Sequence, residues 1–170
     1  ILLSCTIRIP FFLIGAHCMK ISFIIPAYNE EAMIGKCLQS IQKEIAAVRL
    51  TKSNIETEVV VVNNASTDRT KEIALGFTGV RVVDETHKGL VRARRAGFNA
   101  TTGELVANID ADTIMPKGWL LTVLDAFARD RTLVALSGPY IYYDLSAFER
   151  ALVKIFYAFG YGIYLFNHYI

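Results

Sequence analysis

The sequence predicts an α/β fold in which helices flank a mostly parallel sheet. Between residues 20 and 128, short apolar runs alternate four times with longer amphipathic stretches. This alternation is typical of parallel strands joined by right-handed helical crossovers. The run at 58–62 is β-branched and apolar after its first residue, as expected of a strand covered on both faces. Polar clusters follow the strands, at the edge where ligands bind in open α/β sheets.

Composition restricts the class of protein. Of the 170 residues, 53% are hydrophobic and 20% are charged, which suits one domain with a sizeable core and excludes a disordered chain. The formal net charge of +2 gives no indication of nucleic-acid binding. The three cysteines, Cys5, Cys18 and Cys37, are odd in number and lack metal-ligand spacing. We therefore expect a reducing compartment and a cytoplasmic location.

Both ends of the chain are unusually apolar. Residues 1–18 are interpreted as an apolar N-terminal extension, because Arg8 and Pro10 interrupt them and no basic region opens them as in a signal peptide. They are also short for a membrane-spanning helix. The functional domain is then expected at 19–144, beginning at Met19 and without an internal boundary.

Residues 145–170 are expected to form an apolar, aromatic helix. Charged side chains at Glu149, Arg150 and Lys154 interrupt it and make a membrane-spanning helix less favourable. Two interpretations remain open. The helix lies at the cytoplasmic surface of a membrane, where aromatic and cationic side chains are common, or it packs against an acceptor-binding half of the protein.

The first half of the domain is expected to contain two strands, each followed by a helix. The first strand covers 20–26 and ends at its proline. Asn29 is expected to cap the next helix, in which apolar residues recur at 34, 38, 41, 45 and 48 with helical spacing. The second strand covers 58–62, and Ser66 or Thr67 caps a helix that continues to about Leu75.

The second half is expected to continue the same alternation. A short third strand covers 80–83, and a helix that opens at 87–89 ends near Gly103. A buried strand then covers 104–110 and is followed by a helix from about 116 to 128. Further strands are expected at 132–136 and 140–143.

Four polar clusters follow strands of the predicted sheet, at 28–30, 63–68, 85–89 and 110–112. Because the carboxyl ends of parallel strands meet at one edge, we expect these clusters to converge on one crevice. Asp110 and Asp112 are spaced i, i+2 and could bind a hard divalent cation that also contacts phosphate oxygens. The alternative is a strand-end turn, in which Asp110 caps local amides and Asp112 is solvated.

The four clusters carry recognisable motifs. Segments 24–30, 61–68, 88–94 and 109–112 read Ile-Ile-Pro-Ala-Tyr-Asn-Glu, Val-Val-Asn-Asn-Ala-Ser-Thr-Asp, Lys-Gly-Leu-Val-Arg-Ala-Arg and Ile-Asp-Ala-Asp. In this order they resemble the motifs of family 2 glycosyltransferases over roughly residues 20–144. The resemblance implies the GT-A fold, which is a Rossmann-like α/β arrangement, and a nucleoside diphosphate-sugar donor.

The resemblance also implies site residues, position by position. Those expected to contact the donor are Pro26, Ala27, Tyr28, Glu30, Asn64, Ser66, Lys88, Gly89, Arg94, Asp110 and Ala111. Asp112 is the implied ligand of Mg²⁺ or Mn²⁺ and the implied catalytic partner of Asp110. A cation there would stabilise the negative charge that grows on the departing diphosphate. For Lys88 and Arg94, the alternative is an ordinary solvated cation on a helix surface.

This chain departs from the family pattern at three places. Asn63-Asn64 stand where the family often has acids, Ala65 replaces a common glycine, and Arg95 stands where asparagine is frequent. An asparagine amide can still form hydrogen bonds with a base. The choice of nucleotide and sugar is therefore open.

The implied activity is transfer of the sugar to a glycan or a lipid-linked acceptor. The family's catalytic base normally lies in an acidic motif downstream, but residues 113–170 contain no paired acids, and we identify no general base. The alternative is a donor-binding fragment or an inactive partner subunit. A less favoured alternative is a haloacid dehalogenase-like phosphatase, because the Asp-x-Asp at 110–112 resembles the start of its motif, although that motif should follow the first strand of its core.

Overall fold

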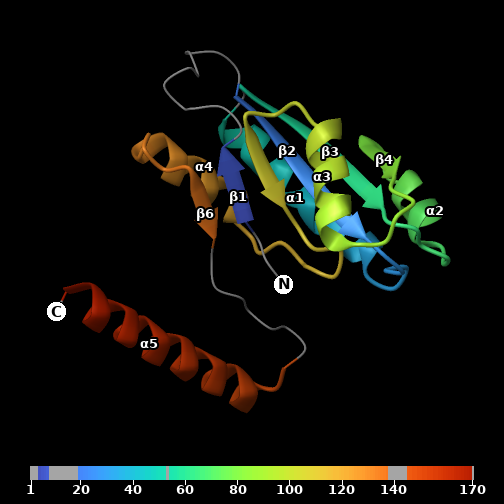
Figure 1. The fold of residues 1–170 in the computed structure, drawn as a ribbon. Coiled ribbons are helices and arrows are strands. Elements are labelled where there is room, and N and C mark those ends of the chain that lie inside the picture. The colour runs from blue at the N-terminus through green and yellow to red at the C-terminus, as the bar shows by residue number, and fades with distance from the viewer. Residues whose placement is uncertain (1–3, 8–18, 53, 138–144, 170) are drawn as a thin grey trace. The chain divides into compact units, whose positions relative to one another are not determined.

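The computed structural model describes residues 4–7, 19–52, 54–137 and 145–169 (Figure 1). The chain divides into two compact units at Ser137. The first unit contains the sheet and four helices among its described residues, and the second contains one helix.

The first unit is built on a six-stranded sheet with the order β4-β3-β2-β5-β1-β6. Four neighbouring strands are parallel: β4 (Val80–Asp84), β3 (Ile55–Asn63), β2 (Met19–Ala27) and β5 (Leu105–Asn108). β1 (Ser4–Ile7) runs antiparallel both to β5 and to β6 (Ala135–Ser137). The predicted α/β class with a mostly parallel sheet is confirmed.

One strand of the sheet, β1, comes from the segment that was expected to be an extension, and it lies between β5 and the edge strand β6. Ser4 pairs with Asn108 of β5 and with Ser137 of β6, so part of segment 1–18 belongs to the sheet. The expected domain start at Met19 therefore lies inside the sheet-forming part of the chain. The strand predicted at 140–143 lies outside the described residues.

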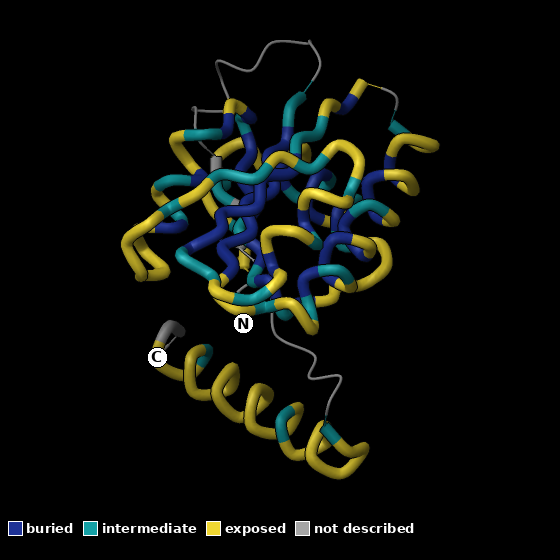
Figure 2. The backbone as a smooth tube through the Cα atoms, turned by 90° about the vertical axis from the view of Figure 1, so that its right-hand side faces the viewer, coloured by how far each residue is buried: buried dark blue, intermediate teal, exposed yellow. Residues whose placement is uncertain are grey.

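Helices cover both faces of the sheet. α1 (Ile34–Thr51) and α4 (Trp119–Arg129) pack on one face, α3 (Leu90–Ala100) packs on the other, and the short α2 (Thr70–Leu75) follows β3 (Figure 1). Buried segments lie in the centre of this unit, while the outer surfaces of the helices are exposed (Figure 2). The larger core lies between the sheet, α1 and α4, and the smaller lies under α3.

The alternation of side chains along β2 divides these two cores. Phe23 and Ile25 are fully buried in the core shared with α1, whereas Ile24 is fully buried under α3. α3 approaches β2 closely at Gly97, where even a Cβ atom would lie 3.4 Å from the Cβ of Ile24. The absent side chain at Gly97 therefore lets α3, and the loop before it, lie close to the sheet.

The predicted starts of the first two helices are wrong, because both helices begin later in the chain. α1 begins at Ile34 and not near Asn29, and α2 begins at Thr70 and not directly after Ser66 or Thr67. Asn29 has a φ of 54°, and its Oδ1 accepts a hydrogen bond from the backbone N–H of Thr67 at 2.8 Å. Its side chain therefore joins two loops instead of capping a helix.

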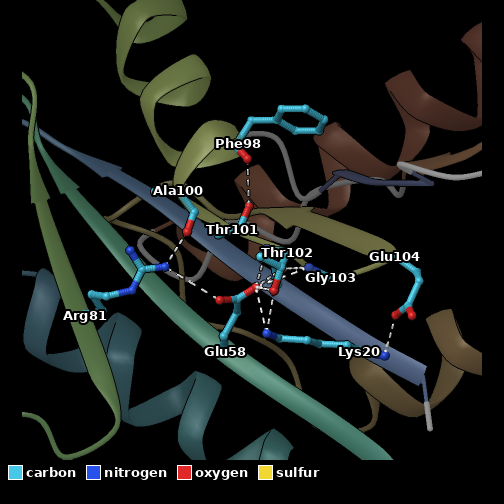
Figure 3. A network of polar contacts seen from close by, with 10 residues as sticks. Lys20, Glu58, Arg81, Phe98, Ala100, Thr101, Thr102, Gly103 and Glu104 are labelled. Carbon is cyan, nitrogen blue, oxygen red and sulfur yellow. Dashed lines mark hydrogen bonds and ion pairs between the residues drawn. The ribbon is translucent and has the colours of Figure 1, made fainter.

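The amino ends of the parallel strands are joined by Glu58 of β3 (Figure 3). Its carboxylate accepts hydrogen bonds from Ser22 Oγ and Thr102 N, both at 2.7 Å, and it forms ion pairs with Lys20 at 3.5 Å and Arg81 at 3.6 Å. Burial opposes ionisation, but the hydrogen bonds and the charge of Lys20 outweigh it, so the pKa of Glu58 lies below its usual value. This network lies at the end of the sheet opposite the loops that follow the strands.

The second unit contains α5 (Ala147–Tyr169). A capping box begins it, because Ser146 N donates to Glu149 Oε2 at 2.8 Å and Glu149 N donates to Ser146 Oγ at 3.3 Å. Its large aromatic side chains, including Phe156 and Phe159, are mostly exposed. Among the described helices, none combines the length and the apolar character needed to span a membrane.

Candidate active site at the carboxyl ends of the strands

A cavity of about 480 Å³ lies where the loops after β2, β3 and β5 meet the start of α3. Its lining residues come from all four of these segments. They are Pro26, Ala27, Tyr28, Glu30, Asn64, Lys88, Gly89, Leu90, Ala93, Asp110, Ala111 and Asp112. The cavity thus occupies the edge at which open α/β sheets bind ligands.

The structure brings together nearly all of the residues that the motifs singled out. Only Ser66 and Arg94 are absent from the lining, and both lie next to it through bonds to lining residues. Leu90 and Ala93 line the cavity although the motifs did not single them out. They lie in the first turn of α3, next to Gly89, where helical spacing could have indicated them.

Ser66 lies beneath the cavity and holds two loops together. Its Oγ accepts a hydrogen bond from Asn29 N at 3.2 Å and donates one to the carbonyl of Ala27 at 3.4 Å. Asp68 adds a second link, since its Oδ2 accepts a hydrogen bond from Glu31 N at 3.0 Å. These bonds fix the loop after β2 against the loop after β3, and with it the position of Tyr28.

Ala65 adopts a conformation that explains the glycine common at this position in the family. Its φ is 57°, in the left-handed region that costs an L-residue roughly 1–2 kcal/mol. The turn between Asn64 and Ser66 requires this backbone direction.

Asn64 positions the loop that carries Lys88. Its Nδ2 donates to the carbonyls of Glu85 at 3.2 Å and His87 at 2.8 Å, and its Oδ1 accepts from Gly89 N at 2.8 Å. Gly89 has a φ of 146°, which other residues rarely adopt. The Asn64 side chain is buried and fully used by this loop, so it acts on the cavity through segment 85–89.

Lys88 and Tyr28 form one wall of the cavity. The ammonium group of Lys88 lies 4.2 Å from the centroid of the Tyr28 ring and also donates a hydrogen bond to its hydroxyl. This cation–π contact holds a positive charge and an exposed aromatic face beside each other. Such a wall can stack on a planar ring and attract an anionic group.

The cavity lining also carries three carboxylates, those of Glu30, Asp110 and Asp112. Asp110 is paired with Arg94, whose Nη2 lies 3.1 Å from its Oδ1. Burial first, and then the negative charges of Asp112, Asp68 and Asp110, raise the pKa of Glu30 above its usual value. Negative charge is therefore concentrated where Asp112 meets the cavity.

This arrangement suits a divalent cation that is coordinated both by protein carboxylates and by the phosphate groups of a bound substrate. In the part of the chain that the structure describes, no group of three His, Cys, Asp or Glu side chains has metal-binding geometry. Mg²⁺ needs fewer, because it is commonly held by one or two carboxylates together with substrate phosphates. Since Asp110 is paired with Arg94, Asp112 and Glu30 are the carboxylates that such a cation would approach.

Cys37 lies directly behind this region in α1. Its thiol is buried and contacts the carbonyl of Asp110, with the sulfur 3.7 Å from the oxygen. Burial and the nearby carboxylates of Asp112 and Asp110 raise the pKa of Cys37 to about 12. The thiol is therefore protonated at neutral pH and takes part in packing.

Comparison with solved structures agrees with this architecture. The structure of TarS residues 1–349 from S. aureus matches with a TM-score of 0.57 and 28% sequence identity, over 65% of this chain and 33% of that chain. A glucosyl-3-phosphoglycerate synthase from Mycobacterium tuberculosis, solved in complex with Mn²⁺, uridine diphosphate and phosphoglyceric acid, matches with a TM-score of 0.51 and 29% identity. That match covers 65% of this chain and 39% of the synthase. The GT-A fold is confirmed.

Sequence relatives are named as glycosyltransferases. Glycosyltransferase GlyA of Streptococcus pneumoniae is 30% identical over 125 residues, which cover 71% of this chain and 17% of the relative. Dolichyl-phosphate beta-glucosyltransferase ALG5D of Trichomonas vaginalis is 35% identical over 97 residues, which cover 54% of this chain and 30% of the relative. The chain thus spans a third or less of the length of these relatives. A family model described as "Glycosyl transferase family 2" matches residues 22–167, and the chain belongs to that family.

Proposed function

We propose that the cavity binds a nucleoside diphosphate-sugar and that the protein transfers the sugar to a glycan or a lipid-linked acceptor. One observation carries this proposal: a single cavity combines the Tyr28–Lys88 wall with the carboxylates of Asp110 and Asp112. The wall suits a base and an anionic group, and the carboxylates suit a cation bound to diphosphate. Family membership supports this class of reaction.

In this proposal each side of the cavity has a separate task. Pro26, Ala27 and Tyr28 line the nucleotide end, and Lys88 places its positive charge along the nucleotide and sugar. Asp110, held by Arg94, faces the ribose or the sugar. Asn64 and Ser66 hold the surrounding loops, so their effect on the nucleotide is through positioning.

Asp112 is proposed to hold Mg²⁺ or Mn²⁺ together with the donor diphosphate. When bound, this cation would neutralise the negative charge on the departing diphosphate as a Lewis acid. Burial and then repulsion from Asp112 raise the pKa of Glu30, and the cation would offset the second of these effects. A Mn²⁺ and uridine diphosphate complex is described for the mycobacterial neighbour, which supports a divalent cation here.

The acceptor's proton needs a base that the cavity does not clearly supply. Its acids are Glu30, Asp110 and Asp112. Asp110 is assigned to the donor, and Asp112 and Glu30 are the carboxylates beside the proposed cation. A donor-binding or partner-subunit role without transfer is therefore the second candidate. The phosphatase alternative loses support, because the Asp-x-Asp segment follows β5, and β2 and β3 precede it in the parallel sheet.

We further propose a cytoplasmic location and contact of α5 with a membrane surface. Exposed aromatic side chains along α5, among them Phe156, Phe159 and Phe166, together with Lys154, support a helix at the membrane interface. Packing of α5 against an acceptor-binding half is the alternative. Co-sedimentation with lipid vesicles of the chain with and without residues 145–170 separates the two.

Calorimetric titration with nucleoside diphosphates, with and without Mn²⁺, tests the donor site. We expect Asp112→Ala to abolish the metal-dependent part of binding and to raise the dissociation constant at least about tenfold, or 1.4 kcal/mol. Asp125→Ala is the matched control, because Asp125 lies in α4 and pairs with Lys52 outside the cavity. If Asp112→Ala and Asp125→Ala bound nucleoside diphosphates equally tightly, with no effect of Mn²⁺, the proposed role of Asp112 in metal binding would be refuted.

Activity needs a separate assay. Release of free nucleotide from uridine or guanosine diphosphate-sugars by the purified chain would favour transfer or hydrolysis over a role in binding alone. Binding without release would favour the second candidate.

A further inference from the structure

A second cavity of about 450 Å³ lies on the other side of the segment that carries Asp112. The segment after β5 lines the first cavity with Asp110, Ala111 and Asp112, and it then lines the second with Ile114, Met115 and Lys117. The opposite wall of the second cavity is α1, which contributes Lys36, Gln39, Ser40, Lys43, Glu44 and Ala47. The two cavities are thus separate but share one connecting segment.

Three lysines give this second cavity its charge. Lys36 and Lys43 are two helical turns apart in α1 and so lie on the same face of the helix, while Lys117 comes from the facing segment. All three side chains are exposed. Within the described residues, none of these ammonium groups forms an ion pair.

The two buried polar residues of the cavity, Ser40 and Glu44, form hydrogen bonds within the protein. Both oxygens of the buried Glu44 carboxylate accept backbone hydrogen bonds at the start of α4, from Gly118 N at 2.9 Å and Leu120 N at 3.2 Å. Ser40 Oγ donates to the carbonyl of Cys37 at 2.7 Å and accepts from Met115 N at 2.9 Å. The Glu44 carboxylate therefore binds backbone N–H groups at the start of α4. The three lysine side chains are left to bind a ligand.

We propose that this lysine-lined cavity binds a phosphate-bearing anion. Three ammonium groups around one cavity suit a compact, multiply charged group, whereas planar carboxylates favour the fork of arginine. The cavity volume exceeds that of a phosphate, and Ala47, Ile114 and Met115 offer apolar contact to whatever carries it. The phosphate can come from a soluble phosphate ester or from a lipid headgroup. The inference does not depend on donor binding in the first cavity.

The only tryptophan of the chain provides a local probe. Trp119 lies two residues after Lys117 at the start of α4, so its fluorescence responds to changes at this segment. Inorganic pyrophosphate is titrated at low ionic strength in EDTA, which removes divalent cations that could bridge it to the acidic first cavity. The second arm measures co-sedimentation with vesicles of phosphatidylglycerol, compared with phosphatidylcholine.

The variants separate the site from general charge. We expect Lys36→Gln with Lys43→Gln, and separately Lys117→Gln, to weaken binding at least about tenfold, since each removes a charged hydrogen-bond donor. The control, Arg49→Gln with Arg129→Gln, removes the same charge as the first pair at exposed positions outside the cavity. Thermal unfolding verifies that all variants are folded.

Each outcome decides the proposal. A saturable Trp119 response to pyrophosphate that the lysine variants weaken and the control retains supports a soluble phosphate ligand. Vesicle binding with the same dependence, without a pyrophosphate response, supports a lipid phosphate. Absence of binding in both arms, or equal loss in the lysine variants and the control, overturns the proposal.

Discussion

Replacing Gly97 by alanine tests how closely α3 must approach the sheet. A Cβ atom at this position would lie 3.1 Å from Val62 Cγ2 and 3.4 Å from Ile24 Cβ, and it would overlap Ile24 Cγ2. Both neighbours are fully buried and belong to the two longest strands, β2 and β3. The side chains therefore cannot move away freely, and α3 has to shift outward.

Two opposing effects set the size of the change. Alanine is about 1 kcal/mol better than glycine in a helix interior. Overpacking a close-packed core typically costs about 1–3 kcal/mol. Because the overlap with Ile24 is severe and both neighbours are buried, we expect the second effect to exceed the first. Gly97→Ala should lower the free energy of unfolding by up to about 2 kcal/mol.

The same substitution at Gly35 is the matched control. A Cβ there would lie 3.6 Å from Ile73 Cγ2, an ordinary contact, so Gly35→Ala should stabilise the protein by about 0.4–1 kcal/mol. Urea unfolding monitored by circular dichroism measures both values. If Gly97→Ala were as stable as Gly35→Ala, the reasoning about the close approach of α3 would be refuted.

Three further predictions concern single side chains. Glu58→Gln should lower the free energy of unfolding at pH 7 by about 1.5–3 kcal/mol, the range for hydrogen bonds to a charged group. Because the folded pKa of Glu58 is lowered, this difference should shrink as the pH falls through that pKa in pH-dependent urea unfolding. Glu30 has a raised pKa, so its ionised form destabilises the fold. Glu30→Gln should therefore raise the melting temperature at pH 7, and the gain should fade as the pH falls through the folded pKa and be gone below the unfolded value. Ala65→Gly should stabilise the protein by up to about 1 kcal/mol in the same unfolding assay, because it relieves the left-handed backbone; a loss of stability would contradict this reading.

The sequence predicted the parallel strands and helices well because their signals are local. The apolar stripe from residue 34 to residue 48 matches the buried face of α1, and the run at 58–62 lies within β3. β1 carried no such signal. Ser4–Ile7 is a strand because β5 and β6 lie on either side of it, and pairing over a hundred residues of sequence leaves no local pattern.

The sequence predicted which residues line the candidate cavity, but it did not predict which hydrogen bonds hold the surrounding loops. Motif order and strand ends indicated Tyr28, Lys88 and Asp112, which do line one cavity. The contacts of Asn29 and Ser66 depend on how two loops pack together, so their assumed capping roles were wrong. The second cavity was not foreseen, because Lys36 and Lys117 are far apart in sequence and meet only in the fold.

The departure at Asn64 from the family's frequent acid follows from the backbone that it contacts. Its amide nitrogen faces the carbonyl oxygens of Glu85 and His87, while its oxygen faces the N–H of Gly89. A carboxylate can only accept hydrogen bonds when ionised, so it would repel the two carbonyls. An asparagine satisfies both kinds of partner at once and keeps Lys88 against Tyr28. The substitution is therefore coupled to the path of segment 85–89, which places the positive wall of the cavity.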